Sequence, residues 1–265
     1  MQFPKLLLLI SAFLIAYSIC PASNATTFPL DEITIADSIN NDTIIEYHAL
    51  NLMIRDCKID KQSAQNQLNK VLKNSRQTFF TQYTGNSENK NWVFPLTGHD
   101  FKSIGGKNGN GFIVSQFDYF DFSKPGGHPA QDIFIKDKNQ DCKDDITLQP
   151  VGVLSVSAGI VLDTEPCWTP DSIWKGGKYI HIYDPVSASI FYYAHNDTIL
   201  VCDGDIVKPG DLIAYVGRTG LNAYAKRSQT HLHFAQFKID ETGYPRPVNP
   251  YKELLKAKSI YLSSH

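Results

Sequence analysis

The chain has 265 residues, of which 42% are apolar, and it carries a formal net charge of −2 at pH 7. This length is sufficient for a packed core in one main domain with a smaller companion region. Because the charge is nearly balanced and no basic stripe follows the sequence, we expect no nucleic-acid partner.

The first 25 residues have the composition of a secretory signal. A single lysine precedes an apolar run over residues 6–19, and small and polar residues follow it. Because this run is shorter than the ~20 residues that a membrane span requires, we predict cleavage after Ala25 and an exported protein, periplasmic or extracellular, without stable membrane insertion. An uncleaved anchor is the alternative. Lipid attachment at Cys20 is disfavoured, because Ile19 stands where a small residue usually precedes the modified cysteine.

Removal of this segment leaves four cysteines, Cys57, Cys142, Cys167 and Cys202. An even number in an exported chain favours two disulfides, and the sequence leaves all three pairings open. No two of these cysteines form a CxxC motif, which argues against a zinc knuckle.

Residues 26–91 are predicted to form a helical or irregular N-terminal region. Between Glu46 and Tyr83 the sequence contains neither proline nor glycine, and apolar residues recur at helical spacing. We therefore expect one or two amphipathic helices, followed by a turn-rich linker over residues 84–91.

Residues 92–255 have a β-rich pattern. Short runs of valine, isoleucine, phenylalanine and tyrosine lie between glycine, proline and aspartate. Several runs alternate apolar with polar residues, which is typical of antiparallel strands with one exposed face. Residues 178–195 form a hairpin candidate with Asp184 and Pro185 at its turn, and residues 256–265 form a C-terminal tail.

Two short motifs in this region carry chemistry. In HLH, His231 and His233 are two residues apart, so on a strand both side chains project from one face. In HPAQD, His128 follows two glycines that would let the backbone turn sharply, and Asp132 opens a predicted strand. Two imidazoles and one carboxylate would leave the fourth position of a zinc ion open, as is typical of catalytic sites.

These motifs, together with the segments VLSVSAGIVLDT, YYAHND and VKPGDLIAYVGRTG that lie between them, resemble the lysostaphin-type or LytM-like zinc endopeptidases, which cut peptidoglycan peptides. The resemblance covers residues 92–255. It implies a mostly β fold, an antiparallel two-layer domain with an open catalytic groove and the lysostaphin-like duplicated hybrid motif, preceded by a small helical region. It also implies the Zn²⁺ ligands His128, Asp132 and His233, and the catalytic residues His195 and His231.

Three departures from the family pattern accompany this resemblance. They are Pro129 and Ala130 within HPAQD, Asn196 after the histidine of YYAH, and a long segment over residues 221–230. The first two leave every implied ligand in place. The third puts substrate preference in doubt, because that segment is expected to flank the groove.

The leading hypothesis is a secreted zinc metalloendopeptidase that hydrolyses peptide bonds in peptidoglycan cross-bridges or stem peptides. Bound zinc would activate water, and His195 and His231 would orient it, move protons and stabilise the oxyanion. One alternative is a catalytically silent wall-binding module or activator of another wall hydrolase, and another is a protein in which zinc only braces loops. The sequence leaves open the bond cleaved, the oligomeric state, release from the periplasm and any inhibitory role of the N-terminal region.

The remaining histidines have no chemical pattern. We interpret His181 as structural, and His48, His99 and His265 as surface or packing residues. The acidic loop over residues 137–145 lacks the central glycine and terminal glutamate of an EF-hand, so a solvated loop is favoured over a cation site.

Overall fold

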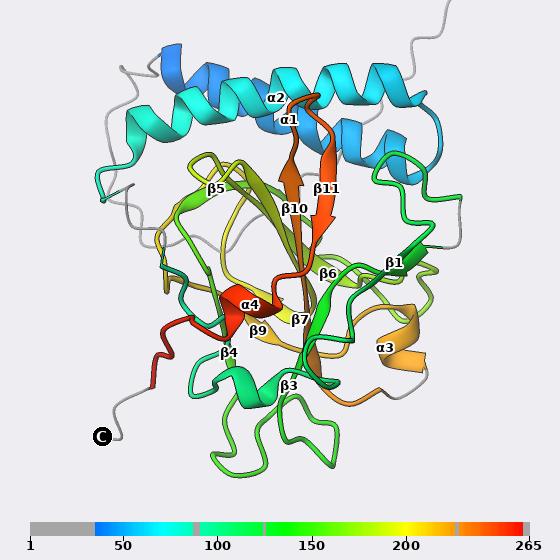
Figure 1. The fold of residues 1–265 in the computed structure, drawn as a ribbon, viewed down its shortest axis with the longest axis vertical. Helices are drawn as coiled ribbons and strands as arrows, with labels where there is room; N and C mark the ends of the chain where they lie inside the picture. Colours follow the sequence, from blue (N-terminus) through cyan, green and yellow to red (C-terminus); the bar gives the residue numbers. More distant parts are fainter. Residues whose placement is uncertain (1–34, 87–90, 124–125, 226–227, 262–265) are drawn as a thin grey trace, which may run out of the picture. The chain divides into compact units, whose positions relative to one another are not determined.

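The computed structural model describes residues 35–86, 91–123, 126–225 and 228–261 (Figure 1). The predicted signal segment 1–25 and His265 lie outside the described residues. The helices are α1 (Ile35–Arg55), α2 (Lys61–Gln82), α3 (Leu221–Ala225) and α4 (Tyr251–Leu254), and a 3-10 helix, η1, spans Phe101–Ser103. Within the described ranges, no helix has the length and apolar character needed to cross a membrane.

The named strands pair antiparallel and form a nine-stranded sheet and a two-stranded sheet. They are β1 (Ile113–Ser115), β2 (Gly126–His128), β3 (Gln131–Phe134), β4 (Gly152–Leu154), β5 (Gly159–Thr164), β6 (Lys178–Asp184), β7 (Ser189–Ile199), β8 (Ile206–Val207), β9 (Leu212–Val216), β10 (His231–Ile239) and β11 (Pro245–Val248). The large sheet has the order β11-β10-β7-β6-β5-β8, β3 pairs with β10, and β9 joins β7 to β4. The predicted mostly β, antiparallel fold with a small N-terminal helical part is confirmed.

Strands β6 and β7 form the predicted hairpin. They pair in register from Asp184 and Ser189 at the turn. The Asp184 carboxylate accepts hydrogen bonds from the backbone N–H groups of Val186 at 2.8 Å and Ser187 at 3.2 Å. The aspartate therefore stabilises the turn through its side chain, which is the physical reason that Asp-Pro is effective there.

Both faces of the large sheet are buried, and alternation along the strands divides their side chains between two cores. Phe191 and Tyr193 of β7 pack with Phe234 of β10 in the first core. Ile190 of β7 and Phe237 of β10 belong to the second core, which also contains residues of α1 and α2. The two helices therefore cover one face of the sheet.

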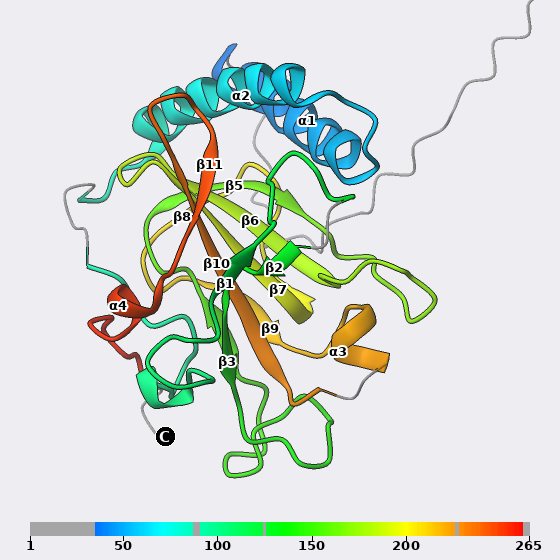
Figure 2. The same ribbon diagram turned by 45° about the vertical axis from the view of Figure 1, so that its right-hand side comes forward.

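Helices α1 and α2 confirm the predicted amphipathic helices and lie side by side (Figure 1, Figure 2). Their apolar residues Leu50 and Leu68 are at most 1% exposed. At the tip of the β10–β11 hairpin, the Thr242 carbonyl accepts a hydrogen bond of 2.6 Å from Gln65 of α2. The helices thus pack directly on the sheet. The predicted boundary between an N-terminal region, residues 26–91, and a separate β-rich domain, residues 92–255, stays a prediction.

The expected pair of disulfides among the four cysteines is wrong. Cys57, Cys142 and Cys167 are free thiols. They lie in three separate segments, which are the turn after α1, the β3–β4 loop and the β5–β6 loop. Counting cysteines in the sequence could not reveal this separation.

The acidic loop between β3 and β4 is only partly solvated, in contrast to the expectation. Asp137 is buried and accepts hydrogen bonds from the N–H of Asp141 at 3.1 Å and of Cys142 at 2.9 Å. Asp144 is also buried and accepts from Ile146 at 3.0 Å. These carboxylates hold the backbone of the loop, and none of its residues joins a possible metal-binding group in the described part of the chain.

Candidate metal and catalytic site

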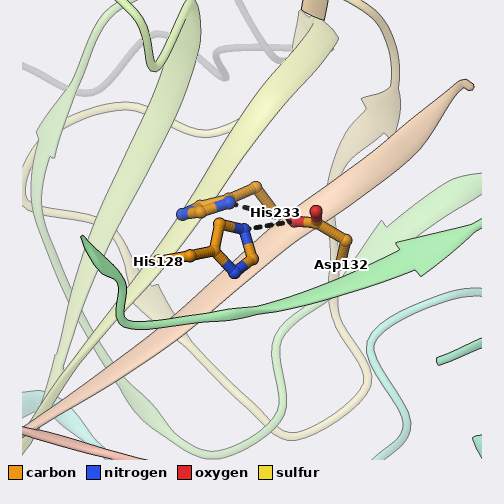
Figure 3. Close-up of side chains that lie close together, drawn as sticks. All are labelled: His128, Asp132 and His233. Carbon is orange, nitrogen blue, oxygen red and sulfur yellow. Dashed lines mark hydrogen bonds and ion pairs between the residues drawn. The ribbon is translucent and has the colours of Figure 1, made fainter. Parts of the chain in front are cut away.

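Strand pairing brings Asp132 and His233 together. Strand β3 pairs with β10 in a register that sets Asp132 directly opposite His233. The Nδ1 atom of His233 lies 3.0 Å from Asp132 Oδ1, as the dashed line in Figure 3 marks. Two residues that are 101 positions apart in the sequence thus become cross-strand neighbours.

His128 reaches the same carboxylate from β2. Its Nδ1 atom lies 2.8 Å from the Gly111 carbonyl oxygen, and its Nε2 atom lies 3.1 Å from Asp132 Oδ1 (Figure 3). The preceding glycines lie within β2, where a sharp turn was expected. Gly127 is required there because any Cβ atom would collide with the carbonyl oxygen of Ile113 on the paired strand β1.

The three side chains fit a zinc ion. His128, Asp132 and His233 each offer one ligand atom, and these atoms all lie within 4.8 Å of one another. Ligands of one tetrahedral zinc, with bonds of ~2.0–2.2 Å, lie about 3.4 Å apart, close to both contacts with Asp132. The three side chains are 34%, 26% and 19% exposed, so the ligand atoms lie at a solvent-accessible position.

His195 reaches the site through a bulge in β7. Between two of their paired positions, β7 contains one more residue than β6, and His195 itself has a left-handed φ of 66°. In a regular strand His195 would share the face of Tyr193. The extra residue instead turns the ring towards His231, with the two ring centroids 4.9 Å apart.

Backbone carbonyls orient the two catalytic candidates. The Nδ1 atom of His195 lies 2.7 Å from the Thr219 oxygen, and the Nδ1 atom of His231 lies 2.6 Å from the Gln229 oxygen. Because a carbonyl oxygen only accepts, each Nδ1 carries the proton and each Nε2 retains a lone pair. The Nε2 atom of His231 lies 3.7 Å from Asp132 Oδ1.

Burial favours the neutral form of both rings. It lowers the pKa of His195 to about 3, and the neighbouring charges of His233 and His231 contribute to this shift. Burial also lowers the pKa of His231, although the carboxylate of Asp132 opposes the effect. A neutral imidazole with a free Nε2 can accept a hydrogen bond or a proton, and a lowered pKa makes it a weaker base than a free imidazole.

Asp132 is the negative centre of the site. Burial alone would raise the pKa of Asp132, but hydrogen bonds from His128 and His233 outweigh burial and hold it well below its usual range. The hydrogen bond with Asp132 likewise raises the pKa of His128 against the opposing effect of burial. Asp132 is therefore ionised at neutral pH, which is the form that ligates a metal.

The structure brings all five predicted site residues together, but sequence reasoning missed the groups that orient them. Gly111, Thr219 and Gln229 act through main-chain carbonyls. Every residue type has this group, so no residue-type signal could have identified them.

A segment of the chain that contains part of the site matches a known protein family. Residues 146–250 match the profile of Peptidase family M23, which confirms the predicted resemblance for this part of the chain. The match includes His195, His231 and His233 and begins after His128 and Asp132.

Three solved structures are also similar to this chain. The catalytic domain of lysostaphin from Staphylococcus simulans has 25% identity and a TM-score of 0.35, over 49% of this chain and 80% of that one. A putative glycyl-glycine endopeptidase LytM from Ruminococcus gnavus has 21% identity and a TM-score of 0.45, over 87% and 90%. A zinc-containing peptidase from Vibrio cholerae has 23% identity and a TM-score of 0.38, over 64% and 41%.

Proposed function

We propose that the protein is an exported zinc metalloendopeptidase that hydrolyses peptidoglycan peptides, with His128, Asp132 and His233 as the zinc ligands. The observation that supports this most is the convergence of their ligand atoms within 4.8 Å, from segments distant in the sequence. The M23 match supports peptidase chemistry separately, since it begins beyond two of these three residues.

Zinc held by these residues would supply a Lewis acid that polarises a peptide carbonyl and lowers the pKa of a bound water. One of the two rings, His231 or His195, would accept a proton from the attacking water at Nε2 and later return it to the departing amine. Their Nδ1–H groups continue to donate hydrogen bonds to the carbonyl oxygens of Gln229 and Thr219, so both rings keep their orientation during the transfer. Before the proton is returned, the protonated ring would stabilise the developing oxyanion.

Digestion of defined muropeptides tests this function. The zinc-loaded protein should release new amine ends, which mass spectrometry would assign to the cross-bridge or the stem peptide. His233→Ala should lose both zinc and cleavage. His99→Ala alters a histidine whose Nδ1 atom contacts the Thr97 carbonyl, outside the site, and should keep both. Absence of new amine ends from every peptidoglycan type would refute the proposal.

The silent wall-binding module gives a different result in the same experiment. Such a protein would bind peptidoglycan without stoichiometric zinc, and His233→Ala would leave binding unchanged. Retention of three ligand candidates beside two oriented histidines supports the enzyme instead.

A further inference from the structure

A second cluster of possible metal ligands lies between α1 and the sheet. It consists of His48 on α1, Asp163 on β5 and Asp203 in the β7–β8 loop, and we call it the helix–sheet cluster. Each residue offers one ligand atom, and these atoms all lie within 4.8 Å of one another. The helix–sheet cluster shares no residue with the candidate catalytic site.

Asp163 is a buried carboxylate whose neighbours include two histidines, His48 and His181. It is 0% exposed, and its oxygens contact His48 Nδ1 at 2.7 Å, Asn51 Nδ2 at 2.6 Å and the Tyr179 hydroxyl at 3.0 Å. Within the described ranges, no lysine or arginine forms an ion pair with Asp163 or Asp203. Two neighbouring carboxylates, one of them fully buried, therefore face histidine rather than a permanently charged side chain, and burial of a carboxylate without full compensation is costly.

His181 supplies an independent indication of a ligand. It is only 8% exposed, and its Nδ1 atom is buried without a hydrogen-bond partner in the described part of the structure. Strand pairing sets His181 opposite Asp163, and its Nδ1 atom lies 3.9 Å from Asp163 Oδ2. A buried polar atom left without a partner calls for a specific explanation, such as an ion.

We propose that His48, Asp163 and Asp203 bind a second zinc ion, with His181 as a candidate fourth ligand. The mixture of imidazole nitrogen and carboxylate oxygen suits zinc better than calcium or magnesium, which prefer oxygen ligands alone. His48 and Asp163 form a hydrogen bond at 2.7 Å, and metal binding would displace its proton. The ion would join α1 to β5 and to the loop before β8, and would hold the N-terminal helices on the sheet.

The proposed site is close to the catalytic candidates but separate from them. Tyr192 of β7 stands between the two, with its ring centroid 4.9 Å from that of His181 and 6.0 Å from that of His233. Its aromatic ring offers no metal-ligating nitrogen. Each site can therefore be removed without changing a ligand of the other.

Zinc content of the full chain tests the proposal. After removal of metal and dialysis against zinc, the wild-type protein should hold two ions, one for each group of ligands. Asp203→Asn is the first variant, because Asp203 is exposed and its loss should leave the fold intact. This variant and His233→Ala should each retain one ion, and the double variant should retain none. Asp205→Asn changes an exposed aspartate of the same loop and should retain two.

The melting temperature provides a second readout. Zinc should raise the melting temperature of His233→Ala, in which only the helix–sheet cluster is left, and should not raise that of the double variant.

The two proposals fail in distinguishable ways. If the wild type holds one ion, which is lost in His233→Ala and kept in Asp203→Asn, the second site is refuted and the catalytic site stands. If the single ion is instead lost in Asp203→Asn and kept in His233→Ala, the helix–sheet cluster stands and the proposed catalytic zinc is refuted.

Discussion

At the scale of single residues, backbone geometry decides where the reactive side chains lie. Gly127 lets β2 approach β1 closely enough to present His128, because a Cβ atom there would meet the Ile113 carbonyl. His195 depends on a different constraint, the left-handed φ of 66° within the β7 bulge. Such strained or crowded positions are common where a fold positions functional groups.

Gly127→Ala should therefore damage the site through the backbone alone. The new methyl group would force β2 away from β1 and displace His128, so zinc affinity should fall by at least ~10-fold, as for other changes that misorient a ligand. Gly126→Ala is the matched control, because its nearest neighbouring atom belongs to the Phe117 side chain at 3.7 Å. Zinc titration of the two variants measures the difference. Equal zinc affinities of the two variants would show that zinc binding does not require the close approach of β2 to β1.

Substitution of the oriented histidines should separate catalysis from metal binding. His195→Ala and His231→Ala should each lower kcat by about 10²–10⁴-fold, the usual contribution of a positioned acid or base. Their zinc content should stay that of the wild type, because neither residue belongs to the ligand group. Muropeptide cleavage rates and metal analysis on the same preparations check both expectations. Loss of zinc from either variant would make that residue a ligand rather than a proton carrier.

The sequence predicted the residues of this site more readily than their geometry. Two short motifs, HPAQD and HLH, contain residue types that commonly bind metals, and they include His128, Asp132, His231 and His233. His195 projects from the same face of the sheet as His231 and His233 because β7 contains one extra residue. Alternation predicts the opposite face for it, so the local pattern alone could not have placed this ring.

At the scale of elements, strand β10 organises the site. It pairs with β3 on one side and with β7 on the other, so that His233 lies opposite both Asp132 and Ala194. The HLH motif is thus at the centre of three strands. Alternation and turn residues predicted the strands themselves, whereas the pairing of β3 with β10 is a long-range contact that local patterns do not encode.

Helix α2 contributes by burying one face on the sheet. Leu68 is fully buried in the core shared with the sheet, whereas its neighbour Gln67 is exposed. Leu68→Ala should lower the free energy of unfolding by about 2–5 kcal/mol, through lost burial and the cavity left behind. Gln67→Ala on the same helix should change it by less than about 0.5 kcal/mol. Urea denaturation of both variants checks this, and equal stabilities would mean that α2 does not pack on the core.

At the scale of the whole described chain, side chains from distant segments hold the helices and the sheet together. His48 and Asp163, for example, are 115 positions apart and in contact. The sequence predicted α1 and α2 because helical periodicity is local. It gave His48 no chemical role, because its partner is recognisable only once the helix lies on the sheet.

Asp118, in the loop between β1 and β2, joins three such segments. It accepts hydrogen bonds from Lys61 at the start of α2, from the Phe120 N–H at 3.1 Å and from the Tyr244 hydroxyl at 3.1 Å. Burial alone would raise the pKa of Asp118, but these donors outweigh burial and lower it. The folded protein therefore prefers the ionised form more strongly than the unfolded chain does.

Because the pKa of Asp118 is lowered in the folded protein, the contribution of Asp118 to the free energy of unfolding depends on pH. A lowered pKa in the folded state contributes stability that is present above the unfolded pKa of about 3.9 and is lost as the pH falls through the folded value. Asp118→Asn should therefore lower the free energy of unfolding by about 1–2 kcal/mol at pH 7. The difference from the wild type should shrink below pH ~4, where the carboxylate of the unfolded chain becomes protonated while that of the folded protein is still ionised.

Urea denaturation at a series of pH values between 7 and 3 measures this difference. Asp171→Asn, at an exposed aspartate in the β5–β6 loop, is the control and should match the wild type throughout. A difference for Asp118→Asn that persists unchanged at pH 3 would assign its effect to shape rather than charge. A convergence of the curves of the wild type and Asp118→Asn at low pH would mean that one ionised side chain couples α2, the β1–β2 loop and the β10–β11 hairpin.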